Sequence, residues 1–229
     1  MITTRLAQDR GHANFGWLDS HHTFSFGSYY DPRHMGVSAL RVINDDRVVA
    51  GAGFDTHRHR DMEIISYVLE GTIEHKDSTG SHSQLKAGEV QVMSAGRGIA
   101  HSEYNPSAKD GLHFLQIWIE PAVDGIAPGY VQQDFSVLRG KNLIVSPDGR
   151  EGSLLIHQDA SVYQLKLAAG EEASHETTAG RSYYVHVAQG SLRVNEVLLN
   201  TGDGAEIAGE ALIRLLAEGE TEALLFELP

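Results

Sequence analysis

The chain has 229 residues, a formal net charge of −13 at pH 7 and no cysteine. Acidic residues outnumber basic ones, 31 to 18, so the chain lacks the basic footprint of a direct nucleic-acid binder and should be repelled by anionic lipid surfaces. Without cysteine, any metal site must use imidazole and carboxylate groups. No stretch has the apolar length of a signal peptide or a membrane span, which predicts a cytoplasmic protein.

Short apolar runs separated by glycine and acidic turns recur along the first half of the chain. They predict β-strands at residues 38–46, 63–71, 72–80, 89–96 and 113–120. The sequence DSTG, at the end of the third run, predicts a hairpin turn, since Asp and Gly supply turn hydrogen bonds and positive φ. No long stretch has a helical period, so we expect an all-β fold, either a sandwich or a barrel.

The two halves of the chain share an order of short motifs. VLEGTI at 68–73 resembles VAQGSL at 187–192, and AGEVQVM at 87–93 corresponds to TGDGAEI at 201–207. Pro, Gly and Asp concentrate in residues 121–150, as in a connector. We therefore expect two β domains of similar design, at residues 1–125 and 126–229.

Two motifs carry paired side chains suited to metal binding. THRH contains His57 and His59, and AHSE contains His101 and Glu103. Residues two apart on a strand project from the same face, so two adjacent strands would bring these four groups together. An isolated His-X-His pair among 13 histidines is weak evidence, but a second pair about forty residues later favours a site.

The donor set restricts the metal without identifying it. Three neutral imidazoles and one carboxylate suit Fe(II), Ni(II), Cu(II), Mn(II) or Zn(II). Four protein ligands on an ion that prefers six leave two positions open. Substrate and dioxygen or water need such open positions to reach the ion.

The motifs resemble those of a known family. GFDTHRHRDMEIISYVLEG (53–71) is similar to the first cupin motif, and AGEVQVMSAGRGIAHSEYN (87–105) to the second in its pirin form. Residues 16–46 also resemble pirins. The resemblance implies a bicupin of two antiparallel jelly-roll β-barrels packed together. It further implies one metal in the N-terminal cupin, with its ligands at His57, His59, His101 and Glu103.

The resemblance also implies a function. Similar bacterial pirins are associated with quercetin 2,3-dioxygenase activity, which implies a flavonol substrate, dioxygen and a divalent metal, with Fe(II) favoured. Glu103 is the expected base for the flavonol 3-hydroxyl if it loosens from the ion. The human relative is described as an iron-containing transcriptional co-regulator, so a non-enzymatic regulator with a protein partner is an alternative. A zinc-dependent sugar-phosphate isomerase is a third class, disfavoured by the lack of an obvious Arg/Lys clamp near the ligands.

Several other residues need separate interpretation. Glu63 occupies the place of the glutamate ligand of generic cupins, but the pirin form favours Glu103 and leaves Glu63 a structural or ligand-orienting role. We expect His113 to be a satisfied core histidine. The remaining candidates in the N-terminal stretch are expected to be surface or packing residues: His21, His22, His34, Phe24, Phe26, Tyr29 and Tyr30.

Counting from the repeated glycines of the C-terminal half tests for a second metal. The positions equivalent to the four expected ligands fall on Glu176, Thr178, Leu215 and Ala217. No paired histidines occur nearby, so we expect a C-terminal cupin-like domain without metal.

Overall fold

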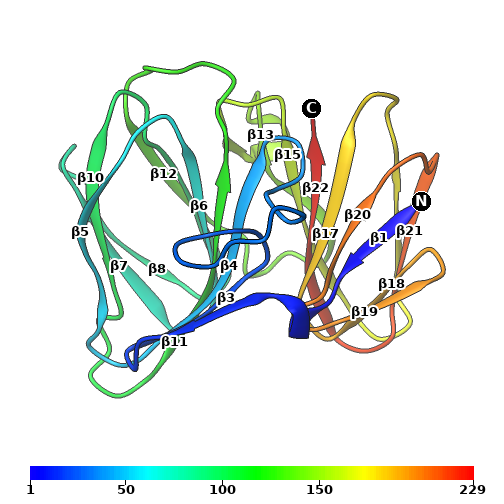
Figure 1. Ribbon diagram of the computed structural model, residues 1–229, viewed down its shortest axis with the longest axis horizontal. Coiled ribbons are helices and arrows are strands. Elements are labelled where there is room, and N and C mark those ends of the chain that lie inside the picture. Colours follow the sequence, from blue (N-terminus) through cyan, green and yellow to red (C-terminus); the bar gives the residue numbers. More distant parts are fainter. The chain divides into compact units, whose positions relative to one another are not determined.

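The computed structural model describes residues 1–229 and consists almost entirely of antiparallel strands (Figure 1). Its helices are two 3-10 turns, Ala7–Asp9 and Arg150–Gly152, and no helix is long and apolar enough to cross a membrane. The all-β prediction is confirmed. The chain divides into two compact units. The N-terminal unit comprises Gly11–Val137 and Leu154–Gln158; the C-terminal unit comprises Met1–Arg10, Leu138–Ser153 and Asp159–Pro229.

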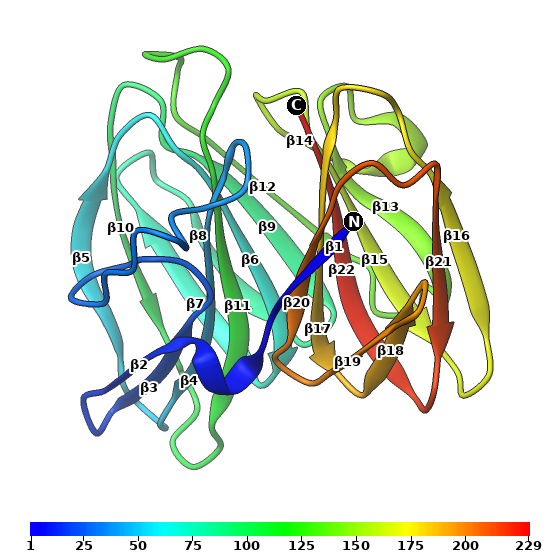
Figure 2. The same cartoon turned by 45° about the vertical axis from the view of Figure 1, so that its right-hand side comes forward.

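The N-terminal unit contains two sheets. The larger has the order β12-β9-β6-β11-β4-β3-β2, and the smaller has the order β5-β10-β7-β8 (Figure 1 and Figure 2). The bounds are β2 (Gly11–Asn14), β3 (Leu18–His22), β4 (Leu40–Val48), β5 (Gly53–His59), β6 (Glu63–Glu70), β7 (Thr72–Asp77), β8 (His82–Lys86), β9 (Glu89–Ser94), β10 (Ile99–Tyr104), β11 (Leu112–Ile119), β12 (Gly129–Asp134) and β14 (Leu154–Leu155).

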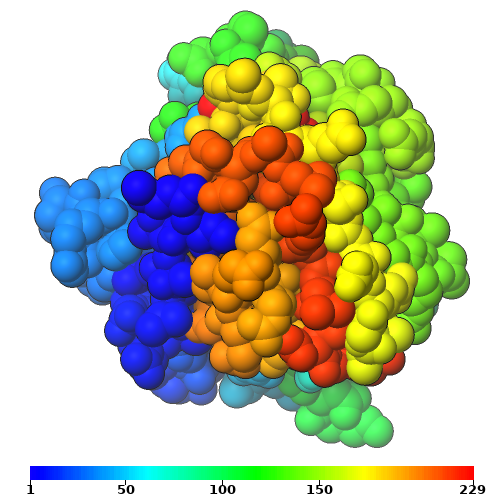
Figure 3. Space-filling view, turned by 90° about the vertical axis from the view of Figure 1, so that its right-hand side faces the viewer, coloured from blue at the N-terminus to red at the C-terminus, as the bar shows by residue number.

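The C-terminal unit also contains two sheets, with the orders β1-β20-β17-β22-β15-β13 and β16-β21-β18-β19 (Figure 2). β1 pairs with β20, and Figure 3 shows the N-terminal segment lying against this part of the unit. The bounds are β1 (Ile2–Arg5), β13 (Gly140–Ser146), β15 (Ser161–Leu167), β16 (Glu172–Glu176), β17 (Ser182–Gln189), β18 (Ser191–Val194), β19 (Val197–Asn200), β20 (Gly204–Ile207), β21 (Leu212–Ala217) and β22 (Thr221–Leu228).

The predicted internal repeat is confirmed by the strand orders. In the larger sheets β9-β6-β11-β4 corresponds to β20-β17-β22-β15, and the two smaller sheets match strand for strand. Gly71 and Gly190 occupy equivalent hairpins with φ of 80° and 86°. A Cβ would lie 2.6 Å from the Gly111 carbonyl oxygen in the first hairpin and 2.2 Å from that of Glu220 in the second. Both turns therefore require glycine.

Each unit is a jelly-roll sandwich with open edges. Every sheet ends in two edge strands, so hydrogen bonding does not close it into the barrel that we expected. The inner faces bury apolar side chains, which favours folding by roughly 25 cal/mol per Å² of apolar surface. In the N-terminal unit this core contains Leu18, Val48, Val68, Ile73, Leu85, Leu112 and Phe114.

β5 differs from the other strands of the smaller N-terminal sheet because none of its residues is fully buried. It pairs closely with β10. A Cβ on Gly53 would lie 2.3 Å from the backbone oxygen of Glu103. The absent side chain at Gly53 therefore lets β5 approach the strand that carries the second histidine motif.

Candidate metal centre

Three of the expected ligands meet where β5 pairs with β10. The register places His101 opposite His57 and Ile99 opposite His59. The ring centroids of His57 and His101 are 4.5 Å apart, those of His57 and His59 4.7 Å, and those of His59 and His101 4.9 Å. Their ring nitrogens approach within 4.8 Å of one another, so the three imidazoles form one group of potential ligands.

The surroundings of His59 and His101 keep these two imidazoles neutral. Burial, reinforced by the neighbouring imidazoles, lowers the pKa of His101 to about 3 and that of His59 to about 4. Neither ring nitrogen of the buried His101 has a hydrogen-bond partner. His57 donates from Nδ1 to the backbone oxygen of Asp55 at 2.8 Å, which directs the Nε2 lone pair away from the backbone. Neutral imidazole is the form that binds a metal.

Glu103, the fourth expected ligand, is held by three donors. Its Oε1 accepts hydrogen bonds from Ser66 Oγ at 3.0 Å and Gln91 Nε2 at 3.2 Å. Its Oε2 accepts from Gln116 Nε2 at 2.7 Å. A carboxylate oxygen of Glu103 lies within 4.8 Å of ring nitrogens of His101 and His75, so these three residues form a second group of potential ligands. Glu103 does not form such a group with all three imidazoles of the first group. His101 is therefore common to both groups.

The three donors to Glu103 belong to a polar row across the larger sheet. Cross-strand pairing joins His22 to Asn44, Asn44 to Gln116, Gln116 to Ser66, and Ser66 to Gln91. The sequence prediction missed this row. Its signal was a single polar residue at an inward position of otherwise apolar strands, as in EIISYVLE, EVQVMS and LHFLQIWI.

His75 was also missed. It is fully buried on β7, its Nε2 lies 3.0 Å from Asp77 Oδ2, and its ring stacks on Tyr130 with centroids 4.5 Å apart. Its Nδ1 has no hydrogen-bond partner. Histidine within TIEHKD has no pairing motif, so sequence spacing alone could not connect it with His101.

Glu63 belongs to neither group. β5 ends at His59, and a turn with Asp61 at φ 47° precedes Glu63, the first residue of β6. The strand parity with the histidines is thereby lost. Glu63 is buried, accepts a hydrogen bond from Ser94 Oγ at 2.8 Å and lies 3.5 Å from His157 Nδ1. Its partners are thus outside the expected ligand set.

A cavity of about 540 Å³ opens on His57, His59 and Glu103. Phe26 meets Trp118 edge-on at 5.3 Å, and Trp118 meets His59 edge-on at 5.0 Å. The aromatic walls of the cavity consist of Phe15, Trp17, Phe26, Phe54 and Trp118. Its polar lining includes Ser20, His22, Ser28, Asn44, Asp46, Asp55 and Gln116. Phe26 and His22, expected to be packing or surface residues, therefore face the cavity.

Other histidines have local partners. His113 is buried in the core, as expected, and its Nε2 lies 2.7 Å from Asp45 Oδ1, but its Nδ1 has no hydrogen-bond partner, so the histidine is only partly satisfied. On the β2–β3 hairpin, the exposed His12 lies 2.6 Å from Asp19 and stacks on His21 with centroids 4.5 Å apart. This third group of potential ligands faces solvent.

A basic hollow of about 540 Å³ contains Arg58, Arg60 and Arg97 and also touches His59. The sequence prediction noted no such arginines near the ligands. Arg58 alternates with the histidines along β5, so it leaves the strand on the face opposite to them. Strand parity thus directs Arg58 away from the imidazole cluster.

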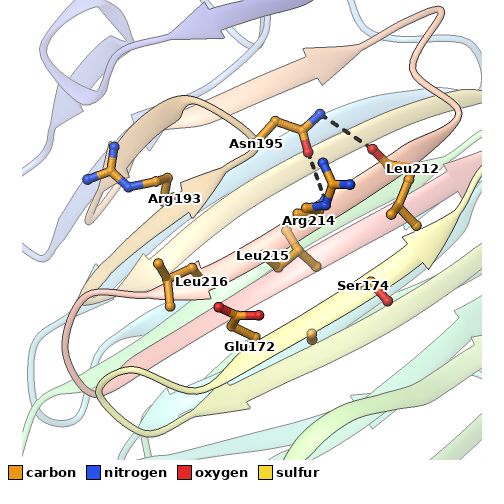
Figure 4. Close-up of a pocket in the computed structure, with 9 residues that line it drawn as sticks. Glu172, Ser174, Arg193, Asn195, Leu212, Arg214, Leu215 and Leu216 are labelled. Atoms are coloured by element: carbon orange, nitrogen blue, oxygen red, sulfur yellow. Dashed lines mark hydrogen bonds between the residues drawn. The ribbon is translucent and has the colours of Figure 1, made fainter.

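The C-terminal unit has a hollow of about 590 Å³ over β16, β18 and β21 (Figure 4). Two of the polar side chains that line it are engaged. Arg193 pairs with Glu218 at 2.6 Å, and Asn195 Oδ1 accepts from the Arg214 backbone N–H at 2.8 Å. No histidine lines it.

In the C-terminal unit, the position counted from the sequence on β16, Glu176, lies one residue beyond the inward position of that strand. Glu176 is exposed, and the buried residue of this strand is His175, opposite Ile213 on β21. The inward residues of β21 are Ile213, Leu215 and Ala217, all apolar. The groups of three or more potential metal ligands all lie in the N-terminal unit.

Two repeated jelly-roll units, the first with clustered imidazoles beside a cavity, define the bicupin class of protein. A family model described as Pirin matches residues 3–119, and one described as Quercetinase C-terminal cupin domain matches residues 143–228. The chain belongs to the pirin family.

Its relatives share the whole length of the chain. It is 54% identical to a quercetin 2,3-dioxygenase of Escherichia coli K12, over 100% of this chain and 99% of the relative. It is 42% identical to a pirin-like protein of Caulobacter vibrioides, over 99% of both chains. The crystal structure of the bacterial pirin YhhW from Escherichia coli in complex with nickel(II) matches with a TM-score of 0.97 and 53% identity, over 100% of this chain and 99% of that one.

Proposed function

We propose that the protein is a metal-dependent dioxygenase that cleaves flavonols such as quercetin. The observation that carries the proposal is the group of three imidazoles, with a buried carboxylate beside it, at an aromatic-lined cavity. The relative named quercetin 2,3-dioxygenase and the nickel(II) complex of a bacterial pirin support it.

The donor set fits one divalent ion, which His57, His59, His101 and Glu103 would hold. Two unpartnered nitrogens on a buried imidazole cost free energy, and a metal bond would remove part of that cost. Fe(II) is the proposed ion, and Ni(II), Cu(II), Mn(II) and Zn(II) suit the same donors. When bound, such an ion supplies Lewis acidity that lowers the pKa of the flavonol 3-hydroxyl.

The aromatic walls would bind the flat flavonol. A cavity of about 540 Å³ lies within the range of small-molecule sites, roughly 300–1,000 Å³. Phe26, Phe54 and Trp118 offer ring faces and edges to the substrate and displace water from it. Dioxygen is the second substrate of the proposed ring cleavage.

Glu103 lines the same cavity and would accept the proton of the 3-hydroxyl on loosening from the ion. Ser66, Gln91 and Gln116 fix its carboxylate, so the acceptor oxygen has a defined position before the substrate binds. The polar row would thus act as positioning residues for the base.

The test is oxygen uptake with quercetin by protein loaded separately with each of the five metals, with elemental analysis of the freshly purified protein beside it. We expect at least one loaded form to consume quercetin and oxygen together. If every loaded form binds its ion and none consumes quercetin, the non-enzymatic regulator replaces the dioxygenase.

A further inference from the structure

Asp46 is a buried carboxyl group that the proposed chemistry leaves unused. It is 3% exposed, lies on β4 opposite Ser20 of β3, and lines the aromatic cavity. Ser20 Oγ donates a hydrogen bond to Asp46 Oδ1. Asp46 itself lines the cavity, so the remaining acceptor capacity of its carboxyl group lies within reach of a ligand bound there.

The surroundings of Asp46 are polar, and neither arginine nor lysine lines the cavity. His22 Nδ1 lies 2.8 Å from Asn44 Oδ1 and 3.4 Å from Ser20 Oγ, so these groups satisfy one another. Burial, with the nearby Asp45 and Glu103 carboxyls, raises the pKa of Asp46 to about 7. A buried carboxyl without an ion pair destabilises the fold, and groups of this kind at cavities are frequently functional.

The position of Asp46 separates it from the imidazoles. Asp46 and Ser20 belong to the larger sheet, whereas His57 and His59 belong to the smaller one, and all four line the same cavity. A flat molecule bound there would meet polar groups from both sheets, with aromatic side chains along its faces.

We propose that Asp46 determines substrate specificity by accepting a hydrogen bond from a second phenolic hydroxyl of the substrate, distinct from the hydroxyl bound at the imidazoles. The cavity would then select polyhydroxylated aromatic compounds. The identification of the ligand as a flavonol rests on the proposed function. The physical basis of selection is that an analogue lacking this hydroxyl leaves the buried carboxyl unpaired.

Binding can be measured in this cavity without turnover. The two tryptophans of the chain, Trp17 and Trp118, both line it, so quenching of tryptophan fluorescence reports occupancy directly. Titrations under anaerobic conditions would compare quercetin with 3-hydroxyflavone, which keeps the 3-hydroxyl and lacks the others. We expect the unsubstituted protein to prefer quercetin.

Asp46→Leu should reduce that preference by about 10-fold or more, because hydrogen bonds to charged groups contribute roughly 1.5–3 kcal/mol. Asp46→Asn, which keeps an acceptor oxygen, should reduce it less. Both variants should melt at or above the temperature of the parent, since each removes a buried carboxyl without a countercharge. A purely structural Asp46 would instead give lower melting temperatures and equal losses for both ligands.

Asp45→Asn is the matched control, because this carboxyl lies on the same strand, contacts His113 and does not line the cavity. It should leave the preference for quercetin unchanged.

An unchanged preference in both Asp46 variants overturns the assignment. If the preference depends on Asp46 but quercetin is never consumed, only the dioxygenase proposal fails; if quercetin is consumed with an Asp46-independent preference, only the present inference fails.

Discussion

At the scale of single residues, His101 connects the two groups of potential ligands. It lies within 4.8 Å of His57 and His59 in one group and of His75 and Glu103 in the other. Because His101 is buried without hydrogen-bond partners, its nitrogens depend on an external ligand for satisfaction. The consequences of losing it should therefore appear in metal binding first.

His57→Ala and His101→Ala should each abolish metal binding and leave a folded protein. Each removes one imidazole from a group of three, and the cores of both units remain intact. Metal content after dialysis and far-ultraviolet circular dichroism would check this. Near-stoichiometric metal in both variants contradicts the ligand assignment.

The two carboxylates should behave differently. Glu103→Gln should lose most of the oxygenase activity and weaken metal binding, because a neutral amide replaces an anion and meets the donor groups of Ser66, Gln91 and Gln116. Glu63→Gln should change metal affinity by no more than about 10- to 100-fold, the usual effect of a residue behind the ligands. Metal content and quercetin turnover of both variants should be compared; the reverse order would indicate a generic cupin site.

The raised pKa of Asp46 predicts a pH-dependent stability difference. Between its unfolded pKa near 3.8 and its folded pKa of about 7, the folded state binds more protons, so Asp46 lowers stability progressively as pH rises. The stability gained by Asp46→Asn should therefore be small near pH 4 and largest above pH 7. The gain should grow by at most roughly 1.4 kcal/mol for each pH unit between the two pKa values.

Urea unfolding of Asp46→Asn and the parent at several pH values would measure this. Both proteins contain Asp45, Glu103 and His22. To a first approximation, the titration of these groups therefore cancels in the difference between the two free energies of unfolding. A difference that stays constant from pH 4 to pH 8 would show that Asp46 titrates normally.

At the scale of elements, the alternation of apolar residues located five strands of the N-terminal unit. The runs at 38–46, 63–71, 72–80, 89–96 and 113–120 correspond to β4, β6, β7, β9 and β11. The strands that were missed include the short polar strands β2 and β8, which bury few apolar side chains. The partners of each strand could not be read from periodicity, since pairing depends on contacts between distant segments.

The same limit explains the site. Two-residue spacing correctly placed His57 beside His59 and His101 beside Glu103 on their strands. The donors that hold Glu103 come from three other strands, and their positions depend on the register of the larger sheet. Sequence spacing within one strand carries no information about that register.

Gly53→Ala tests the close pairing of β5 with β10. A Cβ would lie 2.3 Å from the Glu103 backbone oxygen, so β5 must move away from β10. We expect a loss of stability of about 1–3 kcal/mol, as for overpacked positions, and weaker metal binding. Gly129→Ala is the control, because no atom lies within 4 Å of its added Cβ. Equal effects of the two substitutions on metal affinity would show that the close pairing of β5 with β10 does not determine metal binding.

At the scale of the whole molecule, the two units have the same fold but different interior residues. The strand orders of the two units correspond, and the glycine hairpins at Gly71 and Gly190 are equivalent. The inward positions of β10 carry His101 and Glu103, whereas those of β21 carry Ile213, Leu215 and Ala217. Repetition was visible in the sequence because turns need glycine at fixed places, while interior residues can diverge without changing the fold.

The most direct test of metal-dependent catalysis in the N-terminal unit is a titration of metal-free protein with one divalent ion, with quercetin consumption followed at each addition. Activity should rise linearly with added metal and reach its plateau at one ion per chain, and His101→Ala should stay inactive throughout. Activity that is independent of added metal, or that requires a second ion bound between residues 160 and 229, would contradict it.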